Sequence, residues 1–64
     1  MKLDSTRIEV LLAEQGLSKA KYAEKCEISR QTVSTVLRRG SCEPVTAGKL
    51  ANGLGVPVSE IVQE

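Results

Sequence analysis

The sequence predicts an all-α fold, a compact five-helix domain in which the second and third helices form a helix-turn-helix. Apolar residues recur at helical spacing, no stretch alternates apolar and polar residues with a period of two, and the breaks fall at intervals suited to short helices. The 64 residues, 41% of them hydrophobic, fit a single small domain over 1–64 with one shared core. Because Tyr22 is the only aromatic residue, that core must be aliphatic.

The first helix is expected over residues 5–16. Asp4 or Ser5 is a suitable N-cap, because a short polar side chain can accept a hydrogen bond from the free N–H groups of the first turn. Gly16 is expected to end the helix. The apolar face of this helix consists of Ile8, Leu11 and Leu12.

The second and third helices follow after short connections. The second is expected over residues 18–27 with Ser18 as its N-cap. The third is expected over residues 30–39, between a Ser29 cap and Gly40. The inner side of the second helix should contain Ala20, Tyr22, Ala23 and Cys26.

The fourth helix is expected over residues 45–55, and its helicity must come from packing because Gly48 and Gly53 lower its intrinsic propensity. Its apolar residues are Val45, Leu50, Ala51 and Leu54. After it, Pro57 begins a new segment, and Ser59 can cap a fifth, short helix. That helix would bring two further apolar side chains to the core, Ile61 and Val62.

The short connection between the second and third helices has a geometric consequence. Two or three residues force a sharp crossing, which is the helix-turn-helix geometry, over about residues 18–39. On the third helix, Val33, Val36 and Leu37 fall within about a quarter turn and form a stripe that should be buried. The opposite side presents polar residues: Gln31, Thr35 and Arg38, flanked by Ser34 and Arg30.

This polar face matches the hydrogen-bonding edges of base pairs. Glutamine can make two hydrogen bonds to adenine, arginine can make two to guanine, and serine or threonine can bond either base or touch a thymine methyl group. A helix face that is only solvated is the alternative, and it fits less well because such faces usually alternate Glu and Lys. The expected base-reading residues are Arg30, Gln31, Ser34 and Thr35. The expected contacts to the DNA backbone are Ser18, Lys19, Thr32, Arg38, Arg39 and Ser41.

The distribution of charge is more informative than the net charge of +1. Residues 18–42 contain six basic side chains against two acidic ones, whereas the segments before and after carry net negative charge. A basic middle third suits a phosphate-rich partner. Basic residues that only solvate helix surfaces would give the same pattern, so charge alone leaves both interpretations open.

The two cysteines and the absence of histidine argue against metal or redox chemistry. Cys26 is expected in the core and Cys42 in a loop, both as free thiols of a reduced, cytoplasmic protein. Two thiols cannot complete a tetrahedral zinc site, so we expect no metal and no cofactor. No apolar run is long enough for a membrane span, and the polar N-terminus does not match a signal peptide.

The run "LSKAKYAEKCEISRQTVSTVLRRG", followed by "PVTAGKLANGLGVPVSEIV", resembles the phage Cro/repressor-like (XRE-type) helix-turn-helix transcriptional regulators. The resemblance covers roughly residues 5 to 62 and rests on Leu17-Ser18, on Ala23 at the contact between the two helices, and on "ISRQTVS". It implies a lambda-repressor-like DNA-binding domain of prokaryotic or phage origin. It also implies that the third helix enters the major groove, usually in a symmetric dimer on a pseudo-palindromic operator.

The sequence departs from the family pattern at several positions. Lys19 stands where the family often has a glutamine that bonds a phosphate, and Glu27 stands at a turn position that is commonly glycine, where a left-handed backbone would be strained. Leu12 and Leu37 replace an arginine–glutamate pair found in some members, and we expect an apolar contact between them. One extra residue before Gly40 shifts the two preceding arginines against the family register.

The sequence favours one class of function over two others. The first is a sequence-specific DNA-binding transcriptional regulator, acting as a dimer, with the fifth helix as the best candidate interface although its apolar residues also suit the core. The second is a protein-binding module on the same fold, such as an antitoxin that masks a small toxin and also binds DNA. An enzyme is not expected, because there are no histidines, no obvious paired carboxylates, and no basic partner for either cysteine.

Overall fold

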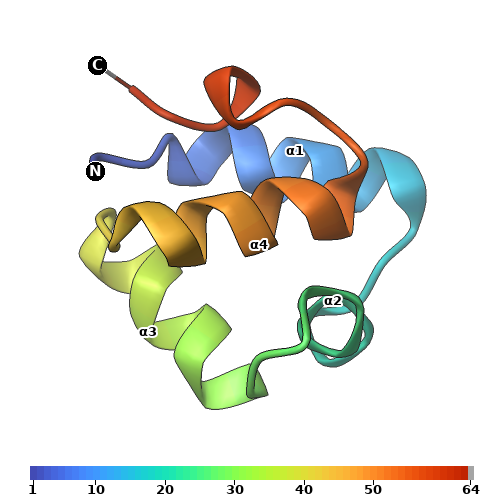
Figure 1. The fold of residues 1–64 in the computed structure, drawn as a ribbon. Helices are drawn as coiled ribbons and strands as arrows, with labels where there is room; N and C mark the ends of the chain where they lie inside the picture. The colour runs from blue at the N-terminus through green and yellow to red at the C-terminus, as the bar shows by residue number, and fades with distance from the viewer. Residues whose placement is uncertain (64) are drawn as a thin grey trace.

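The computed structural model describes residues 1–63 and consists of four α-helices followed by one short 3-10 turn (Figure 1). The elements are α1 (Ser5–Gln15), α2 (Lys19–Cys26), α3 (Arg30–Arg39), α4 (Pro44–Leu54) and the 3-10 turn Val58–Glu60. The helix α4 packs against α2 and against the 3-10 turn, and α2 packs against α3. The all-α class is therefore confirmed, while the predicted end of the domain at Glu64 lies outside the described residues.

The helix boundaries follow from local capping. Side-chain oxygens of Asp4, Ser18 and Ser29 accept hydrogen bonds from the N–H groups three residues later, at 3.0, 3.2 and 3.1 Å. Of the two candidate caps for α1, Asp4 is thus the one used. Ser5 has a different role, because its hydroxyl donates to the Leu37 carbonyl (2.9 Å) and satisfies the C-terminal end of α3.

The predicted fifth helix is wrong, because the chain forms only the three-residue 3-10 turn Val58–Glu60 after Pro57. The residues that follow this turn pair with the start of the chain. The Ile61 carbonyl accepts from the Asp4 N–H (2.8 Å), and the Gln63 N–H donates to the Lys2 carbonyl (3.0 Å). Backbone groups that are used in this pairing cannot continue a helix.

An extended segment at the start of the chain lies between two others, in an arrangement that we call the terminal junction. Residues 1–3 run antiparallel to residues 40–42 on one side and to residues 61–63 on the other, through isolated bridges rather than strands. The Leu3 N–H donates to the Gly40 carbonyl (2.9 Å), and the Cys42 N–H donates to the Met1 carbonyl (3.0 Å). Figure 1 shows the two ends of the chain on the same side of the molecule.

The core is aliphatic apart from Tyr22, as expected, and it includes both Leu12 and Leu37. The buried side chains are Leu3, Ile8, Leu11, Leu12, Tyr22, Ala23, Cys26, Val33, Val36, Leu37, Ala47, Leu50, Ala51, Leu54 and Ile61. Cys42 is half-buried in its loop, and both cysteines are free thiols.

Two predicted core residues are exposed. Val45 is 71% exposed, because it lies in the first turn of α4 on the side opposite Leu50 and Leu54. Ala20 is also exposed, since it lies outside the arc of α2 that carries the buried Tyr22 and Cys26. The periodic pattern of each helix was right, but a short apolar side chain at the edge of the pattern did not mark the buried face.

Close packing explains a glycine in α4 that weakens the helix intrinsically. A Cβ atom at Gly53 would overlap Sγ of Cys26 and would lie 3.1 Å from Cε1 of Tyr22, so α2 and α4 approach as they do only because this position has no side chain. The Tyr22 hydroxyl donates to the Leu50 carbonyl (2.7 Å), which satisfies the one buried phenol. These contacts fix α2 on α4, and α3 is then positioned by α2.

Within residues 1–63, no helix is both long and apolar enough to cross a bilayer.

Candidate nucleic-acid interface

The connection between α2 and α3 consists of Glu27, Ile28 and Ser29. Glu27 adopts a left-handed conformation (φ 60°, ψ 36°), which among residues 1–63 no other non-glycine residue does. The left-handed residue lets the Ile28 N–H donate to the Ala23 carbonyl (3.1 Å) and so turns the chain sharply out of α2. Ile28 packs against the core, and Ser29 caps α3 directly afterwards. The expected helix-turn-helix geometry and the left-handed backbone at Glu27 are both present.

The helix α3 separates buried and exposed residues by angle. Val33, Val36 and Leu37 are buried, as the periodicity predicted. Gln31, Thr35 and Arg38 follow one another at i, i+4 and i+7 and therefore form one stripe on the opposite side. On that side, the exposed residues of the predicted site are Arg30, Gln31, Ser34 and Arg38, with Thr35 half-buried.

The register of the two arginines at the end of α3 is now defined. The helix continues without interruption through Arg39 and ends at Gly40 (φ 71°), so the extra residue lengthens α3 instead of distorting it. Arg38 lies seven residues, almost two full turns, after Gln31 and therefore on its stripe, whereas Arg39 lies seven residues after Thr32. The two arginines therefore serve different faces of the helix.

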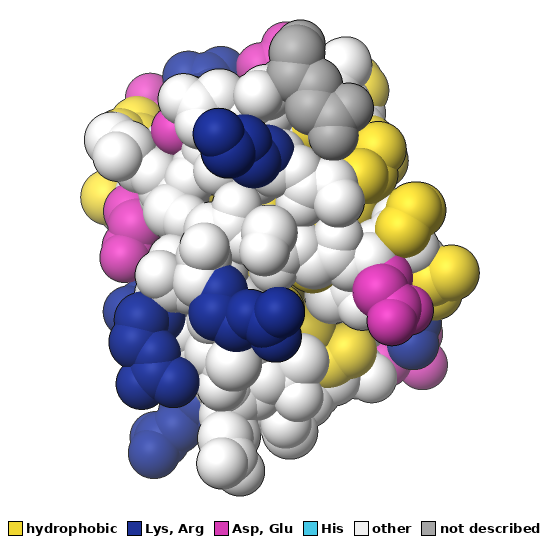
Figure 2. Space-filling model, turned by 90° about the vertical axis from the view of Figure 1, so that its left-hand side faces the viewer, with side chains coloured by type: hydrophobic (Ala, Val, Ile, Leu, Met, Phe, Trp, Pro, Cys, Tyr) yellow, Lys and Arg dark blue, Asp and Glu magenta, His cyan; other side chains and the backbone are white. Residues whose placement is uncertain are grey.

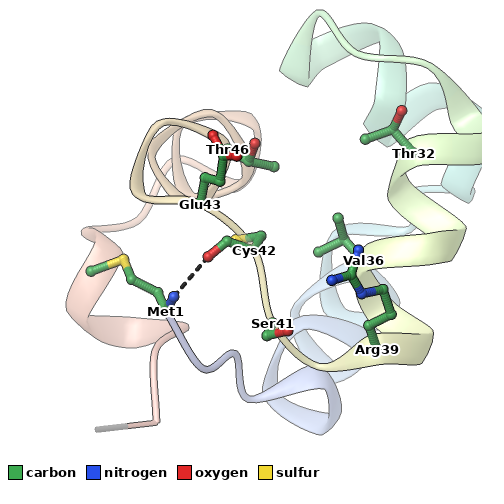
Figure 3. Close-up of a pocket in the computed structure, with 8 residues that line it drawn as sticks. All are labelled: Met1, Thr32, Val36, Arg39, Ser41, Cys42, Glu43 and Thr46. Atoms are coloured by element: carbon green, nitrogen blue, oxygen red, sulfur yellow. Dashed lines mark hydrogen bonds between the residues drawn. The ribbon is translucent and has the colours of Figure 1, made fainter.

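The Thr32 and Arg39 side of α3 borders a hollow of about 480 Å³ (Figure 3). Its walls come from α3, the following loop, the first turn of α4 and the start of the chain, and they consist of Met1, Thr32, Val36, Arg39, Ser41, Cys42, Glu43 and Thr46. The hollow brings together three of the predicted backbone contacts. It also adds Thr46 and Glu43, which the sequence analysis missed because neither residue lies on the helix-turn-helix.

Several polar groups of the predicted site are used in capping. The Ser18 hydroxyl accepts from the Lys21 N–H, and the Ser29 hydroxyl shares a hydrogen bond of 2.7 Å with the Thr32 hydroxyl. Lys19, the first residue of α2, forms an ion pair with Glu9 of α1 (Nζ to Oε2, 3.7 Å). The remaining predicted side chains make no hydrogen bond or ion pair to any of residues 1–63: Arg30, Gln31, Ser34, Thr35, Arg38, Arg39 and Ser41.

Basic and apolar side chains are separated on the face that includes the start of α4. In Figure 2, most Lys and Arg side chains lie toward the left and centre of the view, and the hydrophobic ones gather along the right edge.

Burial raises the pKa of the Cys42 thiol at the hollow, so this thiol is neutral at physiological pH. No group of metal-ligating side chains occurs among residues 1–63.

The geometry agrees with comparison to known proteins. A family model described as helix-turn-helix matches residues 8–61, which runs from within α1 through the 3-10 turn. No curated protein and no solved structure matches the chain significantly. The matched region covers most of the chain, including α2, α3 and the connection between them. The chain therefore belongs to the Cro/C1-type helix-turn-helix family of DNA-binding regulators.

Proposed function

We propose that this protein is a sequence-specific transcriptional regulator that inserts α3 into the major groove of double-stranded DNA. The observation that carries this proposal is the stripe formed by Gln31, Thr35 and Arg38. Its side chains lie outside the core and make no hydrogen bond to residues 1–63, while Val33 and Leu37 fix the same helix to the domain. A rigid helix with unused hydrogen-bonding groups can meet base edges without first breaking internal bonds.

Base reading is assigned to the N-terminal half of α3, since that part of a recognition helix meets the base edges in this motif. Gln31 and Thr35 are central, and Arg30 and Ser34 lie next to them along one edge of the stripe. Arginine and glutamine can each make two hydrogen bonds to one purine, so Arg30 and Gln31 would give the strongest discrimination.

Backbone contacts are assigned to both ends of the helix-turn-helix. At one end, Ser18 and Lys19 lie at the start of α2, where free N–H groups and the helix dipole favour a phosphate. At the other end, the contacts are Thr32, Arg38, Arg39 and Ser41, joined by Thr46 across the hollow. One group lies at the start of α2 and the other on α3 and in the segment after it, so both can contact phosphates while α3 lies in the groove.

A dimer on a pseudo-palindromic operator completes the proposal. One domain of this size offers too few phosphate contacts for tight specific binding at physiological salt, and a second copy doubles them. The 3-10 turn and the residues on either side of it remain the proposed dimer interface, but they offer fewer apolar side chains than expected. Ile61 is fully buried and contributes to the core, which leaves the half-buried Val58 and Val62.

The test is selection of binding sites from a pool of random duplex DNA. We expect an enriched, two-fold related site. In Gln31→Ala or Thr35→Ala, we expect a loss of about 1–3 kcal/mol of binding free energy, confined to one base position. Arg38→Ala should instead weaken binding to all duplexes alike and flatten the salt dependence.

Asn52→Ala is the matched control, because it removes an exposed amide from α4, outside the proposed interface. It should leave both affinity and the selected site unchanged. An unenriched pool, together with unchanged affinity in Gln31→Ala and Thr35→Ala, would overturn the proposal.

A further inference from the structure

The ion pair between Glu9 and Lys19 lies at one of the proposed backbone contacts. Glu9 projects from the middle of α1, and Lys19 is the first residue of α2. Their charged atoms are 3.7 Å apart, and the two side chains are 52% and 46% exposed. We propose that Glu9 limits the affinity of the protein for DNA by holding the Lys19 ammonium and by keeping a carboxylate beside the phosphate that Lys19 contacts. This inference rests on the proposed function.

The direction of the effect follows from the exposure of the pair. Because both side chains are about half exposed, the ion pair is weak and the Lys19 ammonium can leave Glu9 for a phosphate. Two terms then oppose binding: the lost ion pair, and repulsion between the Glu9 carboxylate and the DNA. Both terms disappear when Glu9 becomes neutral, so its removal should tighten binding.

The effect is specific to this contact. The other charged residues of the proposed backbone set, Arg38 and Arg39, have no carboxylate partner among residues 1–63. A second ion pair of α1 joins Arg7 to Glu60 (2.9 Å), and its side chains are similarly exposed, at 44% and 45%. Glu60 of this pair lies in the 3-10 turn that is proposed as the dimer interface, so the matched control is Glu14 instead. Glu14 is an exposed carboxylate of α1 that makes no hydrogen bond or ion pair to residues 1–63.

The experiment measures the affinity of the full chain for a 20-base-pair duplex of mixed sequence at low salt. A non-selected duplex suffices, because backbone contacts do not depend on sequence. The proteins compared are the natural chain, Glu9→Gln, Lys19→Gln, the double variant Glu9→Gln/Lys19→Gln, and Glu14→Gln. Circular dichroism confirms the fold of each, and all three substituted positions are exposed.

We expect Glu9→Gln to bind about two- to fivefold more tightly than the natural chain, which is the range for one exposed ion pair. Lys19→Gln should bind more weakly. In the Lys19→Gln background, Glu9→Gln should give a smaller gain than in the natural chain, because only the repulsion between the Glu9 carboxylate and the DNA is left to remove. Glu14→Gln, which loses the same charge from α1 without breaking an ion pair, should bind like the natural chain. The gain in Glu9→Gln should shrink as salt is raised, because exposed charges are screened.

Several results would overturn the inference. Weaker binding by Glu9→Gln would mean that Glu9 positions Lys19 for the phosphate instead of withholding it. An equal gain from Glu9→Gln with and without Lys19, or an equal gain from Glu14→Gln, would assign the effect to total charge. If the natural chain binds but Glu9→Gln leaves its affinity unchanged, this inference alone fails. If the natural chain binds no duplex even at low salt, the proposed function fails, and the inference fails with it.

Discussion

Glu27 has a left-handed backbone conformation, which is unfavourable for a residue that carries a side chain. Its left-handed conformation ends α2 and sets the angle at which α3 leaves, yet its Cβ atom makes that conformation costly. The side chain is exposed and makes no hydrogen bond or ion pair to residues 1–63, so no contact offsets the strain. The turn is therefore stabilised by the two residues that follow Glu27: Ile28 packs against the core, and Ser29 caps α3.

This strain predicts that Glu27→Gly stabilises the protein. We expect the free energy of unfolding to rise by about 0.5–1 kcal/mol, because glycine adopts the left-handed conformation without a steric penalty but gains entropy in the unfolded chain. Chemical denaturation measures it. The control is Lys25→Gly in the last turn of α2, which should lower the free energy of unfolding by up to about 1 kcal/mol. A loss of stability in Glu27→Gly would show that the turn carries no strain.

The strain at Glu27 was predicted from the family resemblance, because this turn position is commonly glycine in the family. Leu3 shows the opposite case. Its side chain is 3% exposed and belongs to the core, but nothing in the local pattern indicates this, since its burial depends on Ile61 and Gly40, far along the chain. The predicted burial of Ala20 and Val45 was wrong for the same reason, because a helical pattern does not define which edge of a helix the rest of the fold covers.

At the scale of elements, α4 contains two glycines with opposite surroundings. A Cβ atom at Gly48 would meet no atom within 4 Å, whereas one at Gly53 would overlap Sγ of Cys26 in α2. Gly53 is therefore required where α2 and α4 meet, and Gly48 only weakens the helix.

This difference predicts opposite effects for the same substitution. Gly48→Ala should raise the free energy of unfolding by about 0.5–1 kcal/mol through helix propensity. Gly53→Ala should lower it by about 1–3 kcal/mol, because the added methyl group overfills the contact with α2. Thermal unfolding of the two variants tests this. In a Cys26→Ala background, Gly53→Ala should cost less, and an unchanged cost would place the clash elsewhere than at the thiol.

The elements themselves were predicted well where local chemistry decides them. Asp4, Ser18 and Ser29 cap their helices, and each is followed by a helical apolar pattern that is independent of distant residues. The fifth helix was wrong, because residues 61–63 pair with the start of the chain, and that partner is not visible in a local window. At the candidate site, the exposed stripe of α3 was predicted from angle alone. The Glu9–Lys19 ion pair and the hollow beside Thr46 both require the packed arrangement of helices.

At the scale of the whole molecule, stability at high pH is governed by groups that are buried in their neutral forms. Burial, and secondly the proximity of Cys26, raises the pKa of Tyr22 far above its ordinary value of about 10. Burial also raises the pKa of the Cys26 thiol. In the unfolded chain these groups ionise at their ordinary pKa values, while in the folded protein they do not.

Stability is therefore fully present below the ordinary pKa values and is lost as the pH rises above them. For Tyr22 alone, we expect the free energy of unfolding to fall by about 1.4 kcal/mol per pH unit above pH 10. Because Tyr22 is the only tyrosine, its absorbance at 295 nm reports on it directly. Tyrosinate should appear together with the loss of helical circular dichroism, and its appearance in a still helical protein would contradict the burial argument.

Tyr22→Phe separates the two contributions of the phenol. It should be less stable at neutral pH by about 0.5–1.5 kcal/mol, because the hydrogen bond from the phenol to the Leu50 carbonyl is lost. Its decline above pH 10 should nevertheless be shallower than that of the natural chain, since only thiols remain to ionise.

The terminal junction also affects the order in which the domain becomes complete during synthesis. Residues 1–3 leave the ribosome before the other two segments of the junction, and residues 40–42 can pair with them once α3 has been made. The other side of that segment stays open until residues 61–63 arrive, because Ile61 and Gln63 supply the bonds to Asp4 and Lys2. A nascent chain with all four helices outside the ribosome would thus still lack Ile61, which is fully buried in the complete domain. Its Leu3 side chain would not yet be covered on that side. The last of the three segments to be translated is the one that closes the core.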